Sequence, residues 1–232
     1  MFDVKFSDMT GSVYKIHPIQ KAAALDGAHK KQQLEKHGKE TFVDCPGIFD
    51  YKNTGWIMPA WDEFKIYASE NATMAYTGCE KRNSELPMPQ AMSGDITDGI
   101  PKSHSGCPVK RLQPLHFTSP WRIDTEKDIS LLLLPPSYHS DIVNEILIYP
   151  GIVDYTSKFG TINVILSPKR EGTFVIKAGT PLLHIIPIAK REYNAAYGKT
   201  ENKEHLGVVA NAKQFYRRYI MKRSKYNLTL DE

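Results

Sequence analysis

The chain has 232 residues, of which 41% are hydrophobic and 24% charged, and its formal net charge is +4 at pH 7. This composition excludes a disordered chain, and so small a net charge does not by itself indicate nucleic-acid binding. Three cysteines without a CxxC pair exclude a disulfide framework and a standard zinc site. Because the sequence shows neither a leader pattern nor an apolar run of about 18 residues, we expect a protein that is neither secreted nor transmembrane.

The pattern of hydrophobic and turn-forming residues divides the chain into three parts. A mixed segment at residues 1–40 contains a short strand and a lysine-rich helix, and a basic helical tail occupies residues 191–232. Residues 41–190 form a β-rich domain, interrupted at 77–114 by a long loop dense in glycine and proline. We therefore predict a mainly β fold with one sandwich or barrel domain.

The most regular strand patterns lie between residues 115 and 189. Six short hydrophobic stretches are separated by turns that contain Pro or Gly, at residues 116–123, 128–134, 144–149, 160–167, 172–178 and 181–188. Residues 162–166 and 174–176 flank a five-residue turn that ends in Gly172. This spacing predicts that the two stretches pair as a β-hairpin.

One hexapeptide occurs twice, as PGIFDY at residues 46–51 and as PGIVDY at residues 150–155. The Pro-Gly pair predicts a turn at each copy and places Asp50 and Asp154 at the start of the segment that follows. Two explanations are open, duplication of a β-unit and repeated use of one turn. True repeats are similar along a whole unit, whereas the two halves of this chain agree poorly outside the hexapeptide. Asp154 precedes the regular strands and is the candidate site, whereas Asp50 is predicted to be a turn residue.

Residues 149–187 resemble the hairpin core of the dUTPase superfamily. The similarity lies in the GIVD segment at 151–154, in Phe159-Gly160 and in the stretches 164–166, 174–179 and 185–187. It implies a β-clip fold and a nucleotide pyrophosphatase that uses Mg²⁺, in which Asp154 would orient the attacking water. The arginine-containing phosphate motif of that family has no counterpart upstream, where residues 135–140 read PPSYHS.

A second candidate chemistry comes from three residues with the HxD…H order of 2-oxoglutarate oxygenases. His139, Asp141 and His184 would supply two imidazoles and one carboxylate to Fe(II), and Lys190 or Arg191 would bind the carboxylate of the co-substrate. The alternative is structural: Asp141 caps a turn and His184 is a hydrogen-bonded histidine in a core strand.

Five segments distributed over nearly the whole chain carry a wider similarity, at residues 44–50, 55–61, 119–123, 150–154 and 178–187. In these segments the chain resembles an uncharacterised family of proteins encoded by tailed phages of cyanobacteria. It implies a viral protein found in the virion or in the cytoplasm of the infected host cell. We therefore expect a virion component or an accessory binding protein without catalysis and without a cofactor, and Mg²⁺ or Fe(II) enters only under the enzymatic alternatives.

Two groups of residues are candidates for partner binding. Tyr51, Trp56 and Trp61 lie beside Pro and Gly turns, where exposed rings would suit contact with a viral or host protein or with a second copy of the chain. The alternative is that these rings fill the core. In the tail, basic residues are interleaved with aromatic ones in KQFYRRYIMKRSK at residues 213–225. Candidates for binding a nucleic acid or another anionic partner are Arg217, Arg218, Lys222 and Arg223. The alternative is that these residues form the solvated face of a helix.

Overall fold

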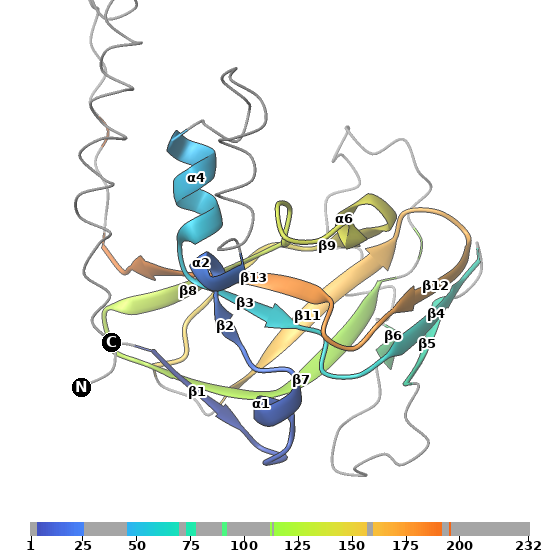
Figure 1. Cartoon of the computed structure of the whole chain (residues 1–232), viewed down its shortest axis with the longest axis horizontal. Helices are drawn as coiled ribbons and strands as arrows, with labels where there is room; N and C mark the ends of the chain where they lie inside the picture. Colours follow the sequence, from blue (N-terminus) through green and yellow to red (C-terminus); the bar gives the residue numbers. More distant parts are fainter. Residues whose placement is uncertain are drawn as a thin grey trace, which may run out of the picture. The chain divides into compact units, whose positions relative to one another are not determined.

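Three antiparallel β-sheets make up the fold in the computed structural model of the chain (Figure 1). The structure describes residues 4–25, 46–69, 73–77, 90–91, 112, 114–156, 160–191 and 195. Contacts group residues 1–36 with 52–190 in one unit and residues 37–51 with 191–232 in another. Every strand among the described residues belongs to the first of these units.

The first sheet contains the longest of the described strands, β7 (Leu115–Thr125). Its order is β1 (Val4–Asp8), β7, β11 (Gly160–Pro168) and β9 (Ile146–Ile148), and β6 (Gln90–Ala91) also pairs with β7. Every second residue of β7 from Leu115 to Ile123 is buried, which is the alternation expected of a strand with one face on a core.

The second sheet has β13 (Pro181–Ala189) at its centre. The order is β10 (Gly151–Val153), β8 (Ile129–Leu134), β13, β3 (Trp56–Pro59) and β2 (Gln20–Lys21). Gly55 precedes β3 with φ +76°, and a Cβ there would lie 2.0 Å from the carbonyl oxygen of Ile185. Only glycine allows β3 to approach β13 this closely.

The third sheet is the smallest and consists of β12 (Gly172–Ile176), β4 (Phe64–Ala68) and β5 (Thr73–Thr77), in that order. In β4, Phe64, Ile66 and Ala68 are buried, while Lys65 and Tyr67 between them are exposed. The sheet therefore has one face on the core and one face in solvent.

Short helices connect the strands: α1 (Val13–Ile16), α2 (Ala22–Leu25), α4 (Pro46–Asn53) and α6 (Ile142–Glu145). The first copy of the hexapeptide begins α4, where Pro46 is tolerated because the first helical turn needs no amide donor. The prediction of Asp50 as a turn residue is therefore wrong. The second copy is not helical: it contains the strand β10, and Asp154 follows this strand.

Side chains from all three sheets contribute to one hydrophobic core. The rings of Phe64 in β4 and Phe117 in β7 lie 4.9 Å apart edge to face, and Trp61 contacts Phe64 at 5.2 Å. Phe6 in β1 contacts Trp56 in β3 at 5.3 Å. These aromatic contacts join the first sheet to each of the other two.

The structure confirms the mainly β fold, and each of the six stretches predicted between residues 115 and 189 contains a strand, although residues 144–145 belong to α6. Of the two predicted forms, sandwich or barrel, the described strands do not make a closed barrel. The predicted hairpin between residues 162–166 and 174–176 is wrong: β11 pairs with β7 and β9, whereas β12 pairs with β4. The division into segments 1–40, 41–190 and 191–232 stays a prediction, and the helix of the tail and nearly all of the 77–114 loop lie outside the described residues.

Candidate functional site

Asp154 follows β10 and is held by two neighbours. One carboxylate oxygen lies 2.6 Å from Nζ of Lys190, which follows β13. The other accepts hydrogen bonds from the backbone N–H of Thr156 at 2.9 Å and from its hydroxyl at 2.7 Å. Lys190 Nζ also donates to the hydroxyl of Thr156 at 3.2 Å, so the three residues form a closed polar cluster.

The next residue, Tyr155, fixes this cluster to the body of the domain. Its side chain is buried, and its hydroxyl donates to the carbonyl oxygen of Thr161 in β11 at 3.3 Å. Burial raises the pKa of Tyr155 to about 12, so the phenol stays protonated and can donate. The Asp-Tyr pair of the hexapeptide thus has one exposed member and one buried anchor.

The surroundings of Asp154 determine its chemistry. The hydrogen bond from Lys190 and those from Thr156 lower the pKa of Asp154 to about 2. A carboxylate that binds a proton so weakly is a poor general base near neutral pH. The ammonium of Lys190 also occupies the position beside the carboxylate that a cation would need, so the described residues do not fit a Mg²⁺ site at Asp154.

His184 is fully buried in β13, and its Nε2 lies 2.7 Å from the carbonyl oxygen of Thr54. Since a carbonyl oxygen only accepts, Nε2 carries the hydrogen and is not available to a metal while this bond is made. Burial lowers the pKa of His184, which keeps the ring neutral. This geometry matches the alternative in which His184 is a hydrogen-bonded core histidine.

The other two candidate iron ligands, His139 and Asp141, have different environments. The rings of His139 and His184 are in edge-to-face contact, with centroids 5.3 Å apart. Asp141 is exposed and lies just before α6, where its side chain makes no capping hydrogen bond. No group of three or more His, Cys, Asp or Glu side chains suited to a metal ion occurs among the described residues. The described geometry does not supply an iron-ligand set, and the iron assignment stays a prediction.

The aromatic residues predicted to contact partners differ in exposure. Trp61 is only 9% exposed and packs on Phe64, which matches the alternative that this ring fills the core. Trp56 is partly buried against Phe6, and Tyr51 in α4 is partly buried. Arg217, Arg218, Lys222 and Arg223 lie outside the described residues.

A different set of exposed side chains lies on the outer face of the third sheet, and we call it the aromatic face: Tyr67, Met74, Tyr76 and Val175. Between 44% and 52% of each is exposed. The two tyrosine rings are in edge-to-face contact at 5.8 Å, and the hydroxyl of Tyr76 donates to the sulfur of Met74 at 3.8 Å. This face was not identified from the sequence; the alternation of Phe64 and Ile66 with Lys65 and Tyr67 in β4 is the sequence signal that could have indicated it.

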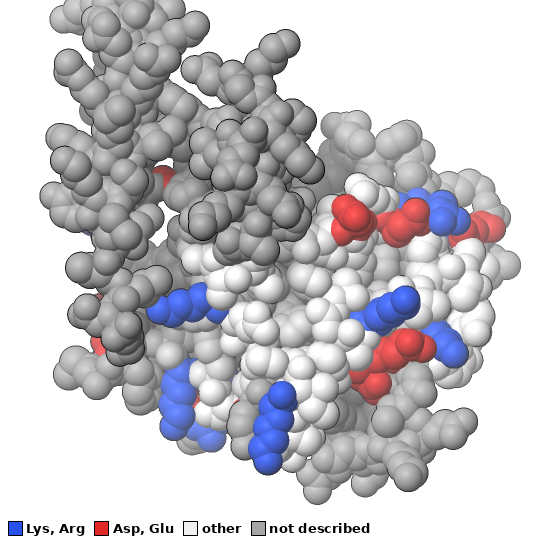
Figure 2. Space-filling view, in the orientation of Figure 1, with Lys and Arg blue, Asp and Glu red and all other residues white. Residues whose placement is uncertain are grey.

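Strand register explains how these side chains come together. Tyr67 in β4 is paired with Met74 in β5. Two residues along β4, Lys65 is paired with Val175 in β12 on one side and with Tyr76 in β5 on the other. Acidic and basic side chains lie close together on the side of Figure 2 where β4 and β12 lie in Figure 1.

Three of the four members of the aromatic face are Tyr or Met, two residue types enriched in protein interfaces.

Comparison of the sequence with protein-family models and with curated proteins gave no match. The resemblances to the phage family and to the dUTPase superfamily therefore stay predictions. In the described part of the chain, no helix is long and apolar enough to cross a membrane.

Proposed function

We propose that this chain is a phage-encoded binding protein without catalysis, which acts in the virion or in the cytoplasm of the infected host cell. The observation that supports this proposal most directly is the aromatic face. Exposed apolar patches are commonly binding sites in soluble proteins. Tyrosine suits such a contact because its ring buries apolar area while its hydroxyl remains able to hydrogen-bond.

The aromatic face is prearranged for contact with another protein. Tyr67 and Tyr76 support each other across β4 and β5, and the core side chains of the same strands hold the backbone beneath them. Ordering rigid rings costs less side-chain entropy on binding than ordering long flexible side chains does. The partner is a viral or host protein with an apolar patch, and a second copy of the chain is the homo-oligomeric form of the same proposal.

Photo-crosslinking in infected cells tests the proposal. A photoreactive phenylalanine at Tyr67 should give a discrete adduct of defined mass, while the same group at the exposed Ile152 on β10 serves as the matched control. To test the tyrosines themselves, the photoreactive group is moved to Met74. The adduct formed from this position should be lost in the double variant Tyr67→Ser/Tyr76→Ser. Equal labelling from positions 67 and 152 would contradict the proposal that the aromatic face is the binding surface. Mass spectrometry of purified virions then separates a particle component from an accessory protein.

The enzymatic alternatives give different results with purified protein. A pyrophosphatase would release pyrophosphate from a deoxynucleotide with Mg²⁺ and would lose this activity on Asp154→Asn. An oxygenase would bind stoichiometric Fe(II) through His139, Asp141 and His184. Metal analysis together with a nucleotide thermal-shift panel distinguishes both from a binding protein, because a ligand that binds the native state raises its melting temperature.

A further inference from the structure

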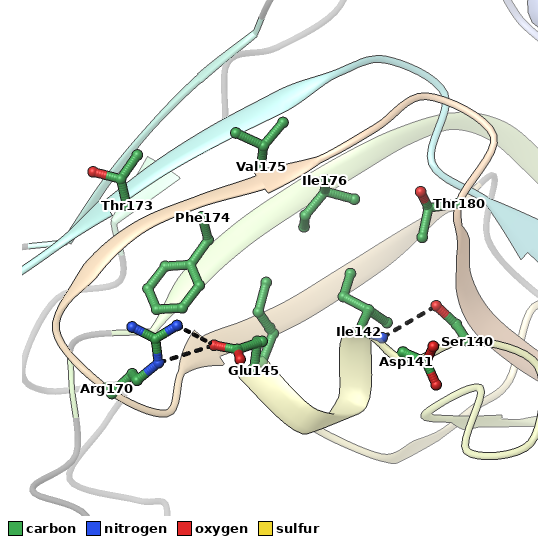
Figure 3. Close-up of a pocket in the computed structure, with 11 residues that line it drawn as sticks. Ser140, Asp141, Ile142, Glu145, Arg170, Thr173, Phe174, Val175, Ile176 and Thr180 are labelled. Carbon is green, nitrogen blue, oxygen red and sulfur yellow. Dashed lines mark hydrogen bonds and ion pairs between the residues drawn. The ribbon is translucent and has the colours of Figure 1, made fainter.

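A groove runs beside β12 on the surface of the domain (Figure 3). Its volume is about 490 Å³, which is within the range of ligand sites. The residues of β12 lie along one side, and those around α6 lie along the other. Ile142, Ile146, Phe174 and Ile176 supply apolar lining, and Ser140, Asp141 and Thr180 supply polar lining.

The groove lies along the edge of β12 rather than on one face of its sheet. Four consecutive residues, 173–176, line it. Successive side chains of a strand point to opposite faces, so a cavity on one face would be lined by alternate residues only. Consecutive lining places the groove at the strand edge.

β12 is an edge strand of its sheet among the described strands. Across its five residues β12 pairs with β4 on one side, and no strand is paired with its other side among the described residues. An edge strand presents alternate backbone N–H and C=O groups that a further strand can bond. Five residues of strand extend over about 17 Å, which is enough to pair with five or six residues of a peptide.

The wall opposite β12 is fixed in place. Lys169 donates from its backbone N–H to the carbonyl oxygen of Glu145 at 2.9 Å and from Nζ to that of Val143 at 2.5 Å. Arg170 forms an ion pair with Glu145 at 2.7 Å and lies over the ring of Phe174, with its guanidinium carbon 5.1 Å from the centroid. These contacts hold α6 against the turn that leads into β12 and close one end of the groove.

Charge distinguishes the two ends. Glu145 and Arg170 neutralise each other at the closed end, whereas the exposed carboxylate of Asp141 lies toward the end formed by Ser140 and Thr180. We propose that the β12 edge binds an extended peptide of a partner protein by strand addition. An apolar side chain of the peptide enters the groove, and a Lys or Arg lies beside Asp141. This site shares Val175 with the aromatic face, but Tyr67 and Tyr76 do not line it.

Fluorescence anisotropy with labelled octapeptides of alternating Thr and Val tests this proposal. One probe carries a Lys at either terminus, and its matched control carries Glu there. The Lys probe should bind roughly two- to fivefold more tightly, which is the range of an exposed ion pair. Asp141→Lys should reverse the preference, and Glu126→Lys in the β7–β8 turn should leave it unchanged.

N-methylation of the Lys probe tests strand addition itself. Only alternate amides of an added strand face the receiving edge, so methylating one set should weaken binding roughly tenfold or more, and methylating the other set should not. The Tyr67→Ser/Tyr76→Ser variant should bind the probe normally, which separates this inference from the proposed function. The proposal is overturned by equal loss from both methylation patterns, by no charge preference, by no binding at millimolar peptide, or by self-association through this edge measured by light scattering.

Discussion

At the residue scale, Asp154 couples its protonation to the stability of the fold. Its pKa is lowered to about 2 by Lys190 and Thr156, whereas an unfolded Asp titrates near 3.8. The unfolded chain therefore binds a proton at higher pH than the folded chain does. The contribution of Asp154 is complete above about pH 4 and is lost as the pH falls toward 2.

We predict that Asp154→Asn reduces the stability of the protein near neutral pH and flattens its pH dependence between about pH 4 and pH 2. Urea unfolding at a series of pH values measures this. The carboxylate is half exposed, so added salt should weaken the effect. Asp128→Asn, at an exposed position, is the control, and an unchanged pH profile in Asp154→Asn would contradict the prediction.

Gly55 gives a second residue-scale prediction. Gly55→Ala places a side chain at positive φ and against the backbone of Ile185, and we expect a loss of about 2–4 kcal/mol in the free energy of unfolding. Gly151→Ala is the matched control because a Cβ there meets nothing within 4 Å. Denaturant titration compares the two variants, and equal losses would contradict the prediction.

Sequence reasoning found Asp154 but not its neighbours. Lys190 was associated with a co-substrate of an iron site, yet it pairs with Asp154, 36 positions earlier in the chain. His184 was a candidate ligand because its residue type and order suited iron, while its hydrogen bond to Thr54 depends on the pairing of β3 with β13. Residue types can be read along the chain, but a partner distant in sequence becomes known only through the fold.

At the element scale, the repeated hexapeptide shows the limit of local signals. The copy at residues 46–51 is helical, and the copy at 150–155 is not helical and includes β10. Pro is compatible with both the first turn of a helix and extended backbone. In the second copy, pairing of Gly151 with Leu133 and burial of Tyr155 favour the extended form, and neither contact is encoded within the six residues.

The predicted hairpin between residues 162–166 and 174–176 failed for a related reason. Hydrophobic alternation located both strands correctly because burial of one face imposes it. It did not identify the neighbours, since β12 aligns with β4 more than a hundred residues earlier. A short turn favours a hairpin, but here tertiary pairing overrides that preference.

The alternation in β12 leads to a matched prediction. Ile176 is 2% exposed, whereas Val175 is half exposed on the aromatic face. Ile176→Thr removes apolar contacts and buries a hydroxyl, which should cost about 2–3 kcal/mol, while Val175→Thr should change stability by no more than about 0.5 kcal/mol. Thermal and urea unfolding compare the two. A larger loss at Val175 would mean that the strand faces are reversed.

At the scale of the whole strand-containing unit, the third sheet depends on the other two for its stability. A three-stranded sheet is stabilised by burial of its apolar face, and here that face is buried against the common core. Phe64 from this sheet packs against Phe117 of the first sheet and against Trp61, and all three belong to the common core. A shared core predicts that the sheets unfold together.

Phe64→Ala tests this coupling. Loss of a buried phenylalanine should cost about 3–5 kcal/mol, and hydrogen exchange from the stable core should accelerate ~100-fold or more. If the sheets unfold as one, amides in β4, β7 and β13 lose protection by the same factor. Tyr67→Ala, on the outer face of the same strand, should change exchange only slightly. Loss of protection confined to β4, β5 and β12 would show instead that the third sheet opens locally, leaving the other two intact around Phe117.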